Sequence, residues 1–278
     1  MRGSVIVDPD GRGLSFVRSG GALAPDTYTV TVRGDELGVR SGFGGRLDGN
    51  GDGTAGDDFT GGFTVRPTDG STLGVPDLVR GPGQTAVLPV SLTQAAGVTE
   101  LQFDLFDAGS DLGVTALNFS GGLTGSIALT AIPDGLRATV VFDKPLEPGT
   151  RTPLMLDVGM LAPTAYGTAH RIAWGDITLK RGATGPVETV RGDDAVQVSA
   201  YFMDTSGNRG YSMLDVQRLQ RVVSGLDTGY AAYPMVDPVL IGDLNGNGQL
   251  TSLDVNRFMQ YVQGQARPEI PALPAGSS

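Results

Sequence analysis

The feature that most constrains the fold of this 278-residue chain is an internal duplication in its last third. With an offset of 39 residues, Leu214 recurs as Leu253, Asp215 as Asp254, Val216 as Val255, Arg218 as Arg257, Val223 as Val262 and Gly225 as Gly264. Apolar residues in both copies are spaced three to four positions apart, which predicts an amphipathic helix. The duplication therefore predicts two equivalent helical units that pack together.

Each copy begins with a twelve-residue loop that is rich in oxygen-bearing side chains. Loop positions 1, 3, 5, 7, 9 and 12 are Asp204, Ser206, Asn208, Gly210, Ser212 and Asp215 in the first copy, and Asp243, Asn245, Asn247, Gln249, Thr251 and Asp254 in the second. Ca²⁺ takes six to eight oxygens from loops with this spacing, where position 7 contributes its backbone carbonyl. The spacing predicts two calcium sites.

The two loops fit a calcium site unequally. Gly248, at position 6 of the second loop, permits a sharp bend, whereas the first loop has Arg209 there and Gly210 next. Each loop offers only two carboxylates, so we expect a dissociation constant on the order of 10⁻⁴ to 10⁻³ M, which suits an extracellular module. A simpler interpretation stays open, in which these loops are turns and Asp215 and Asp254 cap the helices.

Aspartate at position 12, followed by a helix rather than flanked by two helices, resembles a dockerin repeat, and the likeness extends over residues 201–264. Dockerins bind cohesins through helix residues near loop positions 10 and 11. The resemblance implies a partner-binding surface of Met213, Leu214, Arg218, Ser252, Leu253 and Arg257. The copies differ at position 10, so we do not expect two equivalent binding modes.

Residues 84–199 alternate between apolar and polar. The apolar positions include Leu88, Val90 and Leu92; Leu101, Phe103 and Leu105; Ala138, Val140 and Phe142; and Leu154, Leu156 and Val158. A period of two predicts strands with one buried face and hence a β-sandwich. The segments 79–84, 88–92 and 101–105 resemble the start of cohesin domains, which implies a sandwich of the jelly-roll type.

Residues 1–66 contain one clear strand, Thr27 to Val32, and a second candidate at Phe63 to Val65. About seven strands make an immunoglobulin-like sandwich. This region resembles the closing half of a bacterial Ig-like repeat. Residues 67–83 are rich in glycine and proline and predict a linker that leads into the next domain.

A third loop lies inside this first region. Asp48, Asn50 and Asp52, followed by Gly53, repeat the spacing with which the two C-terminal loops begin, and the pair Asp57 and Asp58 would complete a site. The sequence after it predicts no helix. Calcium binding and a plain hairpin turn therefore both stay open for this loop.

The predicted fold class is mainly β with a small α C-terminal module. In chain order we expect an Ig-like fragment at 1–66, a linker or entry strand at 67–83, a cohesin-like sandwich at 84–199, a dockerin-like pair of calcium loop-helix motifs at 200–265 and a proline-rich tail at 266–278.

Charge and composition restrict the partners and the location. A net charge of −10 and a sequence pI near 4.5 argue against nucleic acid, whose phosphates need clustered Lys and Arg. The chain has no cysteine, and no apolar run approaches the roughly 20 residues of a membrane span. We expect a secreted or cell-surface protein whose export signal lies outside this chain.

These features favour a non-catalytic module for calcium-dependent binding of a protein that carries a complementary cohesin or dockerin domain, within a polysaccharide-degrading or adhesive assembly. Because Val198 and Tyr201 are so close in sequence, we expect pairing in trans. His170 reads as a structural residue at a strand start, and no carboxylate pair stands out as catalytic. The alternatives are a carbohydrate-binding sandwich that uses Trp174, and a calcium-rigidified adhesin stalk.

Overall fold

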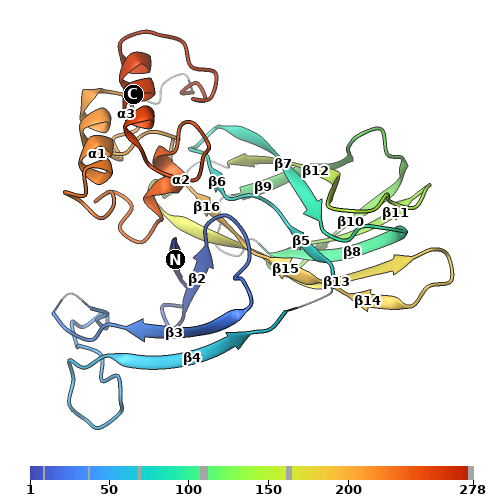
Figure 1. Ribbon diagram of the computed structural model, residues 1–278, viewed down its shortest axis with the longest axis horizontal. Coiled ribbons are helices and arrows are strands. Elements are labelled where there is room, and N and C mark those ends of the chain that lie inside the picture. Colours follow the sequence, from blue (N-terminus) through green and yellow to red (C-terminus); the bar gives the residue numbers. More distant parts are fainter. Residues whose placement is uncertain (9, 37, 68–69, 107–111, 161–164, 275–278) are drawn as a thin grey trace. The chain divides into compact units, whose positions relative to one another are not determined.

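The computed structural model describes residues 1–278 except for 9, 37, 68–69, 107–111, 161–164 and 275–278 (Figure 1). The chain divides into two compact units. Met1–Ala22 and Gly70–Ser278 form the larger unit, and Leu23–Asp69 forms the smaller. This division differs from the predicted domain at 1–66, because the first 22 residues belong to the larger unit.

In the described residues, the larger unit contains two large β-sheets besides a two-stranded hairpin. The first has the strand order β10 (Gly125–Ile132), β11 (Gly135–Phe142), β8 (Val98–Phe106), β13 (Ala169–Arg181), β16 (Ala195–Val198) and β6 (Leu78–Val79), with β14 (Val187–Thr189) also paired to β13. The second has the order β15 (Arg191–Asp193), β5 (Thr72–Gly74), β7 (Thr85–Leu92), β12 (Arg151–Met160) and β9 (Leu112–Phe119). All pairs are antiparallel except β16 with β6 and β15 with β5.

The predicted alternation places one face of β7, β8, β11, β12 and β13 in a shared core. Val90 and Leu154 from the second sheet and Phe103, Val140 and Ile172 from the first are fully buried in one cluster. The sandwich is therefore confirmed, and the fold is mainly β with a small helical part at the C-terminal end. Two short strands of the sandwich, β5 and β6, lie in the segment 67–83, which was predicted as a linker or entry strand.

The helical part follows Ala200, and its described residues form three helices: α1 (Met213–Val223), α2 (Pro238–Gly242) and α3 (Ser252–Val262). α1 and α3 begin and end at positions 39 residues apart, as the duplication predicts. Val216 on α1 and Phe258 on α3 are buried in a second core. Residues from the end of the sandwich, Val79, Val196 and Val198, belong to the same core. The helical part thus shares this second core with the end of the sandwich.

A short hairpin of β1 (Gly3–Val7) and β2 (Leu14–Arg18) adds Ile6 and Val17 to this second core. The Val5 N–H donates to the Met235 carbonyl at 2.9 Å, and the Asp237 N–H donates to Ser4 Oγ at 3.0 Å. The hairpin is therefore anchored on the segment between α1 and α2.

The smaller unit is an antiparallel ribbon of β3 (Asp26–Val32) and β4 (Phe59–Val65). Tyr28 and Phe63 are cross-strand partners, and their rings stack with centroids 5.4 Å apart. The long loop between the strands contains Asp48 to Asp58. Among the described residues this unit has these two named strands, and its resemblance to an Ig-like domain stays a prediction.

Candidate calcium-binding loops

The first loop folds around the side chain of Asp204, which is fully buried. Its Oδ1 accepts hydrogen bonds from the N–H groups of Gly207 at 2.9 Å and Asn208 at 3.1 Å, and its Oδ2 accepts from the Arg209 N–H at 2.7 Å. Position 1 of the loop therefore curls the backbone of positions 4 to 6 around its carboxylate.

Asp215 closes the same loop and starts α1. Its Oδ1 accepts from the Ser206 N–H at 2.9 Å, and its Oδ2 accepts from the N–H and the hydroxyl of Ser212 at 2.9 and 2.8 Å. The side chain is fully buried. This carboxylate joins loop positions 3, 9 and 12 at the helix N-terminus, where negative charge is favourable.

The second loop repeats this arrangement. Asp243 accepts from the N–H groups of Asn247 at 3.2 Å and Gly248 at 2.6 Å. Asp254 accepts from the Asn245 N–H at 3.1 Å and from the N–H and hydroxyl of Thr251 at 2.9 and 2.8 Å. The duplication is therefore a duplication of loop geometry as well as of helices.

Position 6 takes the same backbone conformation in both loops despite its different residues. Arg209 has a φ of +67° and Gly248 a φ of +76°. The left-handed region costs an L-residue about 1–2 kcal/mol, which glycine avoids. The Arg209 guanidinium lies 5.0 Å from the centre of the Tyr166 ring, and this cation–π contact offsets part of that cost.

Most of the carboxylates in these two loops are buried and have no cationic partner among the described residues, which is unusual for aspartate side chains. Asp204, Asp215 and Asp254 are fully buried, and none of the ion pairs in the described part of the chain involves them or Asp243. Burial, and then the nearby charge of Asp215, raise the pKa of Asp204, against hydrogen bonds from Tyr166 and the Arg209 N–H. A buried carboxylate pair of this kind is suited to a cation.

Within the described residues, no three His, Cys, Asp or Glu side chains gather as a metal cluster. Each loop holds two carboxylates, so further ligands would have to be neutral oxygens. Those oxygens are the side chains of Ser206, Asn208, Ser212, Asn245, Asn247 and Thr251 and the carbonyls of Gly210 and Gln249. Such a set is hard and all-oxygen, which matches the preference of Ca²⁺.

The loop at Asp48 shares the first half of this geometry. Asp48 accepts from the N–H groups of Asp52 at 3.1 Å and Gly53 at 2.8 Å, as position 1 does in the other loops. The loop is closed by a hydrogen bond from the Gly49 N–H to Asp57 at 2.9 Å rather than by a helix. Asn50 and Asp52 are exposed.

The side chains predicted for partner binding lie on the outside of the helical part. Met213, Leu214 and Leu253 are 52%, 42% and 47% exposed. Ser252 and Arg218 are also exposed, whereas Arg257 is half-buried with Glu269 at 4.0 Å. Three large apolar side chains therefore face outward at the N-terminal ends of α1 and α3.

Three hydrogen bonds from tyrosine hydroxyls could not be predicted from the loop sequences. The Tyr166 hydroxyl donates to Asp204 Oδ2, the Tyr233 hydroxyl donates to the Asp204 carbonyl at 2.8 Å, and the Tyr211 hydroxyl donates to the Pro271 carbonyl at 3.2 Å. Burial is the main cause of raised pKa values for all three hydroxyls. They act as hydrogen-bond donors throughout the physiological pH range.

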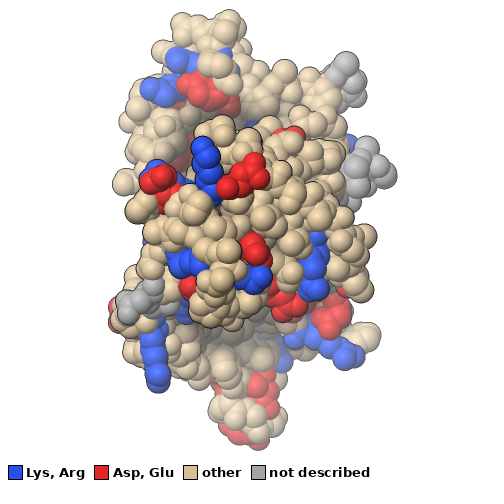
Figure 2. Space-filling view, turned by 90° about the vertical axis from the view of Figure 1, so that its right-hand side faces the viewer, with Lys and Arg blue, Asp and Glu red and all other residues tan. Residues whose placement is uncertain are grey.

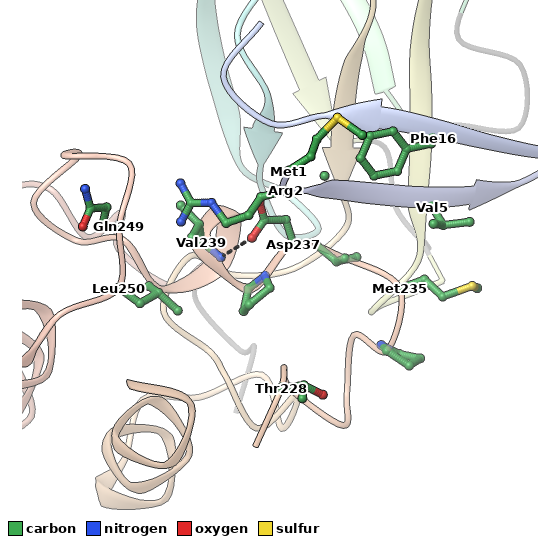
Figure 3. Close-up of a pocket in the computed structure, with 14 residues that line it drawn as sticks. Met1, Arg2, Val5, Phe16, Thr228, Met235, Asp237, Val239, Gln249 and Leu250 are labelled. Atoms are coloured by element: carbon green, nitrogen blue, oxygen red, sulfur yellow. Dashed lines mark hydrogen bonds between the residues drawn. The ribbon is translucent and has the colours of Figure 1, made fainter. Parts of the chain in front are cut away.

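A pocket of about 850 Å³ lies where the β1–β2 hairpin meets residues 234–239 and 249–250, and Figure 3 shows the residues that line it. Asp237 is the one carboxylate among its lining residues, and it caps α2 by accepting from the Val239 N–H at 3.1 Å. Arg2, also in the lining, donates to the Gly248 carbonyl. The pocket lining contains no second carboxylate and no histidine that would form an acid–base pair with Asp237.

Trp174 and His170, considered above as candidate functional residues, both make contacts within the sandwich. Trp174 packs edge-on against Phe103 with centroids 5.2 Å apart, and its indole N–H donates to the Asp193 carbonyl at 2.9 Å. His170 lies at the start of β13, with its Nε2 3.2 Å from Thr168 Oγ1. Trp174 therefore serves the core of the sandwich.

The face in Figure 2 carries Lys and Arg interspersed with Asp and Glu. This face presents no continuous basic surface for a phosphate backbone. Among the described residues, no helix combines the length and the apolar character needed to cross a bilayer.

No protein-family model and no curated protein matches the chain. Solved structures that it resembles are cohesin domains. A non-cellulosomal cohesin from Archaeoglobus fulgidus is 13% identical, with a TM-score of 0.37 over 46% of this chain and 89% of that one. A scaffoldin B cohesin from Acetivibrio cellulolyticus, in complex with a dockerin, is 15% identical, with a TM-score of 0.39 over 46% and 98%. A chain from a type I cohesin–dockerin complex of Clostridium thermocellum is 10% identical, with a TM-score of 0.40 over 50% of this chain and 99% of that one.

Proposed function

We propose that this chain is a non-catalytic, calcium-dependent module for protein–protein interaction. Calcium binds the two loops that begin at Asp204 and Asp243, and it orders α1 and α3, which display a recognition surface. The observation that carries this proposal is the pair of aspartates at loop positions 1 and 12, present in both loops and buried except for Asp243, which accept matching hydrogen bonds from the N–H groups of positions 3, 5, 6 and 9.

The ligand set favours Ca²⁺ over Mg²⁺. Ca²⁺ accepts a flexible shell of six to eight oxygens, whereas Mg²⁺ demands near-octahedral geometry and keeps several waters. With two carboxylates per loop, we expect dissociation constants on the order of 10⁻⁴ to 10⁻³ M. Calcium at that concentration is extracellular, which supports a secreted or cell-surface location.

The partner we propose is a protein that carries a cohesin or dockerin domain, and the pairing is in trans. The helical part shares a core with the end of its own sandwich through residues such as Val198 and Phe258. Met213, Leu214 and Leu253 remain exposed in this arrangement. A partner from another chain can therefore reach them, in an assembly of the polysaccharide-degrading or adhesive kind.

The alternative of a carbohydrate-binding sandwich is less well supported. A sugar platform needs an aromatic face open to solvent, and the Trp174 ring is in contact with Phe103 with its N–H already bonded. The stalk alternative has one observation in its favour, because the Asp48 loop of the smaller unit shares the hydrogen bonds of a calcium loop opening. Calcium there would stiffen the ribbon of β3 and β4.

Titration calorimetry of the full chain with CaCl₂, combined with tyrosine-sensitised terbium luminescence, tests calcium binding. We expect at least two ions per chain, and loss of the terbium signal on adding calcium. Absence of ion uptake by both methods would overturn the proposal.

Partner binding has its own test, because the chain carries both the cohesin-like and the dockerin-like half. Sedimentation velocity of the full chain should show concentration-dependent association in millimolar calcium that reverses with a chelator. If the chain stays monomeric, the same measurement with added cohesin domains from the three related structures identifies a heterotypic partner. No association in either case would contradict the interaction function.

The exposed leucines give a mutational test of the same surface. We expect the double substitution Leu214→Asp and Leu253→Asp to weaken calcium-dependent association at least about tenfold, since burying a leucine contributes about 1.5–3 kcal/mol. Calcium uptake should be unchanged, because neither side chain is a proposed ligand. The matched control is Leu226→Asp, since Leu226 is 68% exposed in the same helical part and lies outside loop positions 10 and 11.

A further inference from the structure

Tyr166 belongs to the sandwich, yet its hydroxyl contacts the first calcium loop. It follows β12 and precedes β13, in the segment whose described part begins at Ala165. The hydroxyl donates to Asp204 Oδ2 and accepts from the Tyr201 N–H at 3.0 Å. One oxygen atom therefore joins the sandwich, the connection between the two parts and position 1 of the loop.

The ring of Tyr166 is held as firmly as its hydroxyl. The centre of the Tyr166 ring lies 5.5 Å from the centre of the Tyr201 ring and 5.0 Å from the Arg209 guanidinium carbon. The neighbouring backbone is paired to the end of the sandwich, with the Gly167 N–H donating to the Ser199 carbonyl at 2.8 Å and the Ser199 N–H donating to the Thr168 carbonyl at 2.9 Å. A shift of Asp204 would therefore be transmitted to β16.

The second loop has a different neighbourhood. Asp243 Oδ2 accepts from the Gly248 N–H, and among the described residues no tyrosine hydroxyl donates to Asp243. Position 6 there is glycine, so no guanidinium stacks on a sandwich ring. The aromatic contact is thus a property of the first loop, where Arg209 also departs from the usual glycine.

We infer that Tyr166 couples calcium binding in the first loop to the order of the sandwich end, so that the ion fixes the two parts as one rigid body. This inference rests on the proposed calcium function and goes beyond it, because it makes the first site a structural joint and leaves the second site to order α3 alone. Tyr166 is a positioning residue. It holds the Asp204 carboxylate through a charge-assisted hydrogen bond, the stronger class of such bonds.

Hydrogen exchange of the full chain, with and without calcium, tests the coupling. In the wild type we expect calcium to slow exchange in both loops and also, about tenfold, at residues 165–171 and 196–201, which matches the contribution of a hydrogen bond to a charged group. In Tyr166→Phe both loops should still be protected by calcium, while the added protection at 165–171 and 196–201 is lost. Tyr211→Phe is the matched control, since it removes a hydroxyl in the same loop that contacts a carbonyl, and it should behave as the wild type.

A second variant keeps the test decisive should Tyr166→Phe unfold. Asp204→Asn retains the size of the side chain and removes the charge, so calcium should protect the second loop and no longer the sandwich end. Calcium protection of the sandwich end in Asp204→Asn, or its absence in a wild type whose loops are protected, overturns the inference and leaves the proposed function standing. Protection nowhere overturns both.

Discussion

Replacing Asp215 and Asp254 with alanine together should weaken calcium uptake by the two C-terminal loops at least about a hundredfold. Loss of a group that merely orients a metal ligand costs about 10- to 100-fold in affinity, so loss of a carboxylate ligand reaches at least the upper end. Each carboxylate also holds the N–H groups of loop positions 3 and 9. Its removal disconnects the loop from the helix that follows. Titration calorimetry measures the loss.

The fold of these variants needs a separate check, because the same carboxylates cap α1 and α3. Losing a cap costs about 1 kcal/mol, which a chain of this size tolerates. The milder pair Asp215→Asn and Asp254→Asn keeps one oxygen at each position and should lose calcium with less loss of stability. Asp227→Asn is the matched control, since Asp227 pairs with Arg221 at 2.7 Å near the end of α1 and is not a proposed ligand. Equal uptake in the control and the double variants would contradict the site.

Uptake that remains in the double variants would report on the smaller unit. The Asp48 loop is the remaining candidate, and Asp48→Asn in the same background should abolish such uptake. If the residual uptake persists, the ion is bound elsewhere and the Asp48 loop is a turn.

The duplication and the sandwich could be predicted because both depend on local repeats. A helix that buries one face repeats every three to four residues, and Val216 and Val255 follow that spacing into the second core. A strand with one buried face repeats every second residue, as Leu88, Val90 and Leu92 do. The geometry of a helix or strand sets this spacing, so it can be recognised in the sequence without knowing which distant residues the element contacts.

The joint between the sandwich and the helical part depends on long-range neighbours and could not be read in this way. Tyr166 and Asp204 are 38 residues apart in the sequence, and no local spacing points from one to the other. Gly81, interpreted as a linker residue, permits close approach, because a Cβ there would lie 2.3 Å from the Tyr201 ring. Five-residue α2 had a readable signal, since Asp237 followed by Pro238 is a helix start. With five residues, this helix is too short to show an apolar repeat of three to four positions.

Replacing Phe258 with alanine should lower the free energy of unfolding by about 3–5 kcal/mol, the range for removing a buried phenylalanine ring. Phe258 is fully buried on α3, one turn after Asp254, and its ring lies edge-on to Tyr211 with centroids 6.2 Å apart. It belongs to the core that joins the helical part to the sandwich. The cavity would therefore loosen both the position-12 ligand and the shared core.

Urea denaturation of the full chain in saturating calcium measures this loss. Phe258→Leu is the matched control, because it keeps most of the apolar volume, and it should lose markedly less stability than Phe258→Ala. We also expect Phe258→Ala to weaken calcium binding in the second loop, since α3 must be ordered to present Asp254. A Phe258→Ala variant within about 1 kcal/mol of the wild type would show that α3 is only loosely packed. It would also remove the physical link, proposed above, between ion binding and a rigid recognition surface.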